Sequence, residues 1–233
     1  MSYYTSRLLV ACLIVAAAAP ALAGDNLIFG GGEVSGHDSS YGQVGVVTPL
    51  PGNTMSDGWA VRATTDALTY KYRATQDIKA TGAGGQVTLG YQEAGAPGWW
   101  AFFTGPVFQY THLSPDDPAS RARGGVWGWI AQGEGEYFLT KNLKGNLGGS
   151  YIFAGNDAFW TRLRLLYRVS GQMFVGPEGI YQGDSDYRAW ELGGGLFGIA
   201  LDADTQLGLH AGVRKVQNFA ASPYGGLEVG RSF

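Results

Sequence analysis

After one apolar run near its N-terminus, the chain has no second stretch long enough to form a membrane helix. The remainder consists of short segments in which apolar and polar residues alternate, and the last segment ends on Phe233. A period of two places alternate side chains on opposite faces of a β-strand. Such segments, separated by turn residues, are typical of membrane-spanning barrels. The sequence therefore predicts an all-β fold, a transmembrane antiparallel up-and-down β-barrel in the outer membrane of a Gram-negative bacterium.

The N-terminal residues form a separate segment. A basic residue precedes an apolar run that Pro20 ends, and Ala21-Leu22-Ala23 is a small-x-small cleavage site. This order predicts a secretory signal peptide over residues 1–23, followed by one barrel domain over residues 24–233. Cys12, the only cysteine, lies in the signal peptide, so the mature chain has no disulfide framework.

The composition agrees with a barrel and excludes some partners. Charged residues make up 15% of the chain, and there are 38 glycines. The mean hydropathy is −0.05, as expected where lipid-facing and lumen-facing side chains alternate. The net charge is −3 and no block of lysines and arginines is present, which argues against nucleic acid as a partner.

Twelve strands account for the alternating segments. An even number brings both chain ends to the same side of the membrane. With the ends in the periplasm, the longest connection, Ser114–Gly124, falls on the outer face, and the long Pro49–Gly58 loop falls on the periplasmic face. The predicted strands are 26–36, 40–49, 59–73, 78–92, 99–113, 125–139, 143–154, 158–169, 173–183, 187–201, 205–217 and 223–233.

Residue parity assigns the faces of the strands. In segment 158–169, Leu163, Leu165 and Tyr167 alternate with Arg162 and Arg164. A charged side chain on the lipid face costs about 2–4 kcal/mol at the membrane midplane, so the arginines are predicted to point into the lumen. Aromatic residues at the interfaces anchor barrels in the membrane. The predicted members of these girdles are Trp99, Trp127, Trp129, Tyr151 and Trp190.

Turn lengths then predict how lumen residues face each other. A loop at residues 140–142 places Glu134 opposite Gly148, and a loop at residues 155–157 places Gly148 opposite Arg164. For the next turn, a loop at residues 170–172 places Glu178 opposite Arg164, whereas a loop one residue shorter would turn Glu178 toward lipid. The predicted row is Glu134, Gly148, Arg164, Glu178 and then, as an open candidate, Glu191.

Clustered lumen charges allow several roles. They suit a gate, a saccharide contact or an acid–base pair. We favour mutual neutralisation instead, because a narrow lumen buries its charges and a buried charge must be paired. The predicted lumen charge network comprises Glu134, Arg162, Arg164, Glu178, Glu191, Arg214 and Glu228.

The histidines, His37, His112 and His210, do not form a recognisable catalytic pattern. No GxSxG or HExxH motif is present, so the chain is predicted not to be an enzyme and to need no cofactor. Asp116-Asp117 and Asp184-Ser185-Asp186 lack the EF-hand spacing, and aspartate in a turn usually bonds its own backbone. We therefore predict no metal site.

Several short motifs are similar to a known family. The segments that carry the resemblance are Gly30–Ser35, Val46–Gly52, Thr111–Pro118, Gly176–Glu178, Tyr187–Trp190 and Gly225–Glu228. They resemble the bacterial cellulose biosynthesis protein BcsS family, most specifically in Pro49-Leu50-Pro51-Gly52 and in Leu113–Pro118. The resemblance implies an outer-membrane accessory of cellulose production and supplies no catalytic residues.

The leading functional hypothesis is a non-enzymatic barrel that assists export or surface attachment of a β-glucan. Two alternatives stay open: a small-solute or oligosaccharide channel, and an enzyme that modifies lipids of the outer leaflet. The expected partners are outer-membrane lipid, cellulose or its export machinery, and the barrel assembly machinery acting through Phe233. The predicted outer-loop contacts for a glycan or partner are His112, Ser114, Asp116, Asp117, Arg121 and Arg123.

Overall fold

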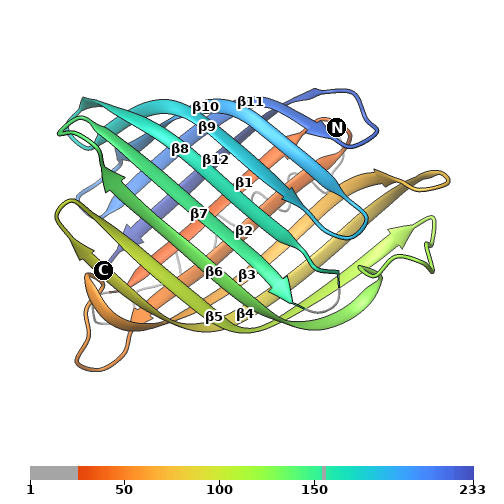
Figure 1. Cartoon of the computed structure of the whole chain (residues 1–233), viewed down its shortest axis with the longest axis horizontal. Helices are drawn as coiled ribbons and strands as arrows, with labels where there is room; N and C mark the ends of the chain where they lie inside the picture. Colours follow the sequence, from red (N-terminus) through yellow and green to blue (C-terminus); the bar gives the residue numbers. More distant parts are fainter. Residues whose placement is uncertain (1–25, 154–155) are drawn as a thin grey trace.

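The computed structural model describes residues 26–153 and 156–233, so the predicted signal peptide lies outside the described residues. Over these residues the chain forms one closed antiparallel barrel in which each strand pairs with its neighbours in sequence and β1 pairs with β12 (Figure 1). No helix among the described residues is long and apolar enough to cross a membrane. The strands are β1 (Leu27–Ser35), β2 (Ser39–Pro49), β3 (Asp57–Arg73), β4 (Asp77–Gly95), β5 (Gly98–Ser114), β6 (Gly124–Phe138), β7 (Leu143–Phe153), β8 (Phe159–Ser170), β9 (Met173–Gly183), β10 (Arg188–Ala200), β11 (Thr205–Val216) and β12 (Ser222–Ser232).

The twelve-stranded barrel confirms the predicted fold class and strand count. Each predicted strand end lies within three residues of the observed one. The agreement has a simple cause. Alternation and turn residues are local signals, and each of the predicted turns separates two runs with the same alternation.

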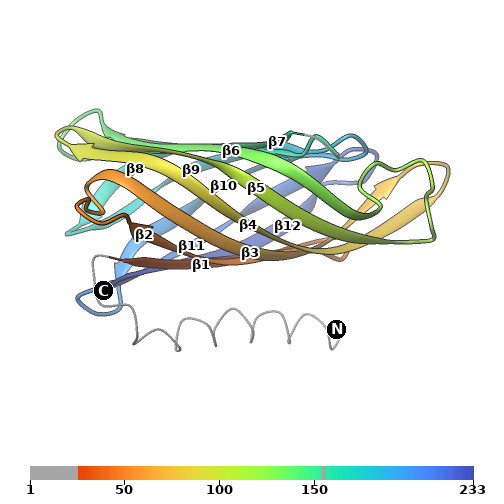
Figure 2. The same cartoon turned by 90° about the horizontal axis from the view of Figure 1, so that it is seen from below.

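The barrel has two distinct ends. At the terminal end, the backbone of Asn26 and the backbone of Phe233 exchange two hydrogen bonds, with N···O distances of 2.8 and 3.0 Å. At the opposite end, called the distal end below, the β3–β4 and β5–β6 hairpins project farther than the others (Figures 1 and 2). β3, β4 and β5 contain 17, 19 and 17 residues. β1, β2 and β7–β12 contain 9 to 13 residues each.

The two faces of the wall follow the predicted parity. Leu147 and Leu163 face outward and are 62% and 60% exposed, whereas Arg164 is buried inside. Such an apolar outer surface is what lipid contact requires. Trp127, Trp129, Tyr151 and Trp190 are exposed on the outward register, as predicted for girdle residues.

Trp99 is an exception to the predicted girdle. It is the cross-strand partner of Glu136, which lies on the lumen face of β6, so Trp99 shares the lumen register. The outward position belongs to Trp100, whose ring lies 5.8 Å from that of Tyr91. The error arose because a Trp-Trp pair at a strand end offers no apolar–polar contrast to set the parity.

The predicted register was right at two hairpins and wrong at one. Glu134 lies opposite Gly148, as predicted. Gly148, however, lies opposite Arg162 rather than Arg164, because β7 and β8 pair two residues away from the predicted register. Ile152 N–H donates to Ala158 O at 2.8 Å, which makes this connection longer than the predicted three residues. A two-residue shift keeps every side chain on its own face, so hydrophobicity could not detect it.

Glu178 lies opposite Arg164, as predicted, although by a different device. Ser170 pairs with Met173, and a bulge between Arg168 and Ser170 restores the lumen register. The bulge shifts the register by one residue, which is the shift that the prediction attributed to a loop one residue longer. Glu191 does not continue the row next to Glu178, because it lies opposite Ile180 on β9 and Arg214 on β11.

Candidate functional site

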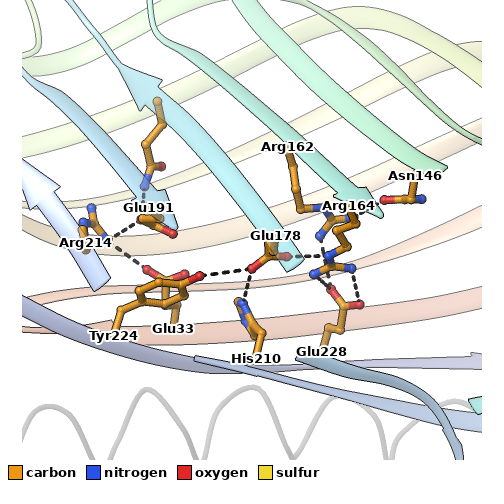
Figure 3. Close-up of polar contacts among 11 residues, drawn as sticks. Glu33, Asn146, Arg162, Arg164, Glu178, Glu191, His210, Arg214, Tyr224 and Glu228 are labelled. Carbon is orange, nitrogen blue, oxygen red and sulfur yellow. Dashed lines mark hydrogen bonds and ion pairs between the residues drawn. The ribbon is translucent and has the colours of Figure 1, made fainter. Parts of the chain in front are cut away.

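The middle of the lumen is crossed by an ion-paired network centred on Arg164 of β8. Its guanidinium donates to Glu178 on the neighbouring strand β9. It also donates to the two carboxylate oxygens of Glu228, on β12, at 2.8 and 3.1 Å. The side chains of Arg164 and Glu178 are 4% and 0% exposed. Figure 3 shows these groups converging from separate strands, so the bridge joins parts of the wall that are not adjacent.

Three further residues join this network. Arg162 lies 3.2 Å from the second oxygen of Glu228. His210 Nδ1, on β11, lies 2.8 Å from Glu178, and the Tyr224 hydroxyl donates to the same Glu178 oxygen at 3.4 Å (Figure 3). Glu178 thus accepts from three partners. Hydrogen bonding of this kind is what allows a carboxylate to remain ionised where water is excluded.

A second group of lumen charges surrounds Arg214 of β11. Its guanidinium lies 2.9 Å from Glu33 on β1 and 3.2 Å from Glu191 on β10 (Figure 3). It also donates to the hydroxyl of Tyr187. Gln182 donates to Glu191 at 2.8 Å. Arg214 therefore ties the β1–β12 side of the barrel to β10.

Glu134 belongs to a third group, and this corrects the predicted row. It pairs with Arg62 of β3 rather than with Arg164. The Arg62 guanidinium also lies over the rings of Phe29 and Phe103, at 5.1 and 4.5 Å from their centroids. Such contacts favour a partly desolvated arginine.

The prediction missed Glu33, Arg62, His210 and Tyr224 as members of the lumen groups. Each has lumen parity in the sequence, and that was the available signal. Their partners lie on non-adjacent strands, and the barrel's geometry, rather than any local spacing, brings them together. The remaining members of the predicted network, Arg162, Arg164, Glu178, Glu191, Arg214 and Glu228, do meet in two connected groups.

Asp66 is the lumen carboxylate that differs from these. It faces inward from β3, opposite Gln43 on β2 and Gly84 on β4. No hydrogen bond or ion pair joins its carboxylate to any residue in 26–153 or 156–233. Tyr41 lies on β2, two residues from Gln43 toward the distal end and on the same lumen face, and it is 40% exposed. Solvent therefore reaches the Tyr41 side chain, whereas the Asp66 carboxylate is half-buried.

The distal end of the lumen is filled by apolar side chains from opposite walls. The rings of Tyr70, on β3, and Tyr187, before β10, lie 4.8 Å apart. The Tyr70 hydroxyl donates to Asp184 at 3.2 Å. We call the buried group here the distal cluster: Tyr70, Tyr72, Ile78, Ala80, Leu113, Tyr187, Ala189, Val216 and Phe219. Burial of this kind stabilises by about 25 cal/mol per Å² of apolar surface, so the cluster closes this end by packing.

The β5–β6 loop is fastened over the distal cluster. Asp117 accepts from the Tyr72 hydroxyl at 2.8 Å, and Ser120 donates to Asp186 at 2.6 Å. Arg121 lies 2.9 Å from Asp157 in the next loop. The loop thus bonds to β3 and to two other connections, and it forms part of the closed distal surface.

The predicted outer-loop residues divide into two sets. Asp116 and Arg123 pair with each other through two hydrogen bonds of 2.7 and 2.8 Å. Asp117 and Arg121 fasten the loop as described. His112 and Ser114 lie on β5 and face outward, away from the loop. The structure therefore does not bring the six residues together at one point.

The histidines and the aspartate pairs are engaged in other contacts. His37 Nε2 lies 3.0 Å from Ala220 O, and His210 contacts Glu178. Asp184 accepts backbone N–H groups of Asp186 and Tyr187 at 2.8 and 2.9 Å. Burial raises the pKa of the Asp184 carboxyl, and these donors partly oppose that effect. Within the described residues, no three histidine, cysteine or acidic side chains converge as metal ligands would.

Comparison with protein families gives one match that spans almost the whole barrel. The family described as cellulose biosynthesis protein BcsS matches residues 27–233. No curated protein matches the chain.

Comparison with solved structures returns other barrels at low sequence identity. The KdgM porin in complex with disordered oligogalacturonate has a TM-score of 0.51 at 13% identity, covering 89% of this chain and 99% of the porin. The transport unit of autotransporter AIDA-I from Escherichia coli has 0.56 at 11%, covering 99% and 97%. The translocator domain of NalP from Neisseria meningitidis has 0.54 at 9%, covering 99% and 96%. These likenesses concern the fold.

Proposed function

Because the chain belongs to the cellulose biosynthesis protein BcsS family, we propose that it is an outer-membrane barrel that assists export or surface attachment of a β-glucan. We further propose that it acts through its distal surface and not as an open pore. The cellulose link rests on the family, and the mode of action rests on the lumen.

The observation that carries this mode of action is the pairing of charges across the lumen. Arg164 bridges β8 to β9 and β12, and Arg214 bridges β11 to β1 and β10. Separating a buried ion pair leaves an uncompensated charge, which costs about 3–5 kcal/mol. A solute that passed through would have to part these groups and then the distal cluster. Conduction is therefore disfavoured both at the charged middle of the lumen and at the distal cluster.

The distal surface offers chemistry suited to a polyhydroxylated ligand. Asp116 and Arg123 form an exposed bidentate pair, and Arg121 of the same loop makes a single ion pair of 2.9 Å with Asp157. Paired carboxylates and guanidinium groups keep acceptor and donor capacity for sugar hydroxyls. Because the β5–β6 loop is fastened by Asp117 and Ser120, it presents these groups with little ordering cost on binding.

The test measures surface cellulose in a deletion strain, by dye binding and by cellulase-sensitive mass. The strain is complemented with wild type, with a chain in which residues 115–123 are replaced by a glycine–serine loop, or with a matched control replaced at residues 140–142. We expect wild type and the control to restore cellulose, and the distal-loop variant to fail while still reaching the outer membrane. Normal cellulose in the deletion strain itself would contradict the proposal.

A channel is the second candidate, and one observation favours it. The lumen-facing side chain of Tyr41 is 40% exposed, so solvent reaches part of the interior of the barrel. Single-channel recording in planar bilayers separates the two candidates. We expect the wild-type protein to be silent. A steady conductance that Arg164→Ala alters would favour the channel instead.

A further inference from the structure

On the three longest strands, the chemistry of the outward-facing side chains changes along the strand. A membrane strand needs about 9–11 residues to cross the hydrocarbon region, and β3, β4 and β5 contain 17, 19 and 17. Their distal ends therefore extend past the apolar band, as the projecting hairpins in Figures 1 and 2 show. On the outward face, the aromatic side chains nearest this end are Phe108, Tyr110 and Trp127, and the Phe108 and Trp127 rings lie 5.0 Å apart.

Beyond these aromatic residues, the outward face becomes polar and basic. The next cross-strand row is Thr69, Thr81 and His112, and the row after it is Lys71, Lys79 and Ser114. Successive rows are about 7 Å apart along a strand. We call these six residues the distal basic strip. Its position directly beyond aromatic residues corresponds to the headgroup level of a membrane.

Two like charges face each other within the strip. Lys71 and Lys79 are direct cross-strand partners, an arrangement that is normally destabilising. Lys71 Nζ lies 2.7 Å from Asp38, whereas Lys79 has no ion pair with any residue in the part of the chain that the structure describes. Farther out, Arg73 and Asp77 pair at 2.6 Å and neutralise each other. The Asp38 carboxylate also interacts with Lys79, so the two lysines share one counter-charge and a net charge of +1 remains.

The other end of the same three strands carries the opposite charge. Asp57 and Glu93 are direct partners on the outward face near the terminal end, opposite Trp100 on β5. The sheet is thus acidic at one membrane boundary and basic at the other. A boundary that carries anionic headgroups would attract the lysine end of the sheet.

We propose that the distal basic strip binds the phosphate group of a lipid headgroup in the leaflet around the distal end. Lysine binds phosphate as a point charge, and a phosphate beside Lys79 would add the second counter-charge that Lys71, Lys79 and Asp38 together lack. The hydroxyls of Thr81 and Ser114 can donate to the remaining phosphate oxygens. This assignment concerns the barrel's lipid surroundings and does not depend on a role in glucan export.

The test uses the full barrel in phosphatidylcholine vesicles containing phosphatidic acid, and native mass spectrometry counts the lipids that stay bound. The test variant is Lys71→Gln with Lys79→Gln. The control is Lys141→Gln, which removes an exposed lysine from the β6–β7 turn at the terminal end. We expect phosphatidic acid retention to fall about 25-fold in the double variant, about fivefold for each lysine, and to be unchanged in the control.

Two results would overturn the proposal. One is equal retention of phosphatidic acid by wild type and by the double variant, provided that both show the gel mobility of a folded barrel. The other is lysine-dependent binding of inorganic phosphate alone without retention of the lipid, which would assign the strip to a soluble anion. Loss of lipid in the double variant, with inorganic phosphate unable to compete at millimolar concentration, supports the lipid headgroup.

Discussion

At the scale of single residues, two lumen carboxylates have contrasting surroundings. Glu178 is fully buried and accepts from Arg164, His210 and Tyr224. Asp66 shares the same interior but touches no donor among the described residues. Removing the Glu178 carboxylate would leave its donors without an acceptor. Removing the Asp66 carboxylate would leave no donor unpaired among the described residues.

This contrast predicts that removing the charge has a large effect on stability at Glu178 and a small one at Asp66. Glu178→Gln should lower the free energy of unfolding by about 3 kcal/mol, the lower end of the range for a broken buried pair, because Arg164 keeps Glu228. The matched change Asp66→Asn should stay within about 0.5 kcal/mol of wild type. Unfolding in urea from lipid vesicles measures both. A large loss for Asp66→Asn would show that its carboxylate has a partner in solution.

The sequence alone could not predict that Glu178 has partners and that Asp66 has none among the described residues. Both positions have lumen parity, and parity was readable. Which lumen charges meet depends on how the strands tilt and stagger around the barrel, which sets distances between non-adjacent strands. Arg62 with Glu134, and Arg164 with Glu228, are 72 and 64 residues apart in sequence. No local spacing encodes such pairs.

At the scale of elements, alternation and turn residues were sufficient to predict all twelve strands, but not every register. The β6–β7 hairpin followed its predicted turn, and the β8–β9 hairpin reached the predicted pairing through a bulge. The β7–β8 pair departed from prediction by two residues. A displacement by an even number preserves both faces, so burial provides no penalty against it.

Disulfide trapping tests that register directly. Leu147 and Leu163 are outward cross-strand partners, so Leu147→Cys with Leu163→Cys should form a disulfide in the folded barrel. The predicted but rejected register would instead pair residue 147 with residue 165. Leu147→Cys with Leu165→Cys serves as the control and should remain reduced. Mobility on non-reducing gels reads the outcome, and cross-linking of the control alone would reverse the assignment.

At the scale of the whole molecule, the lumen is organised in layers. Apolar groups containing Phe103 and Phe174 lie toward the terminal end, ion pairs occupy the middle, and the distal cluster closes the far end. Met55 of the β2–β3 loop packs on the first of these groups. Side chains fill the barrel over much of its length, so its outer surfaces are the parts most accessible to a large ligand.

Phe233 gives a prediction about assembly. Its backbone, directly after β12, pairs with that of Asn26 at the seam between β12 and β1. We propose that this aromatic residue beside β12 contributes to recognition by the outer-membrane insertion machinery. Phe233→Ala should therefore lower the amount of barrel in the outer membrane several-fold, while Ser232→Ala should not. Immunoblots of membrane fractions measure this, and equal amounts would remove Phe233 from the proposed signal.

The seam also determines when the protein can finish folding. β1 is synthesised first, yet its second neighbour is β12, which is synthesised last. Until β12 arrives, the growing sheet has two open edges, which are sites of aggregation. Arg162 and Arg164 also lack Glu228 during that time. The chain is therefore expected to complete its fold in one late closing event, and to need protection in an unfolded state until its final residues are available.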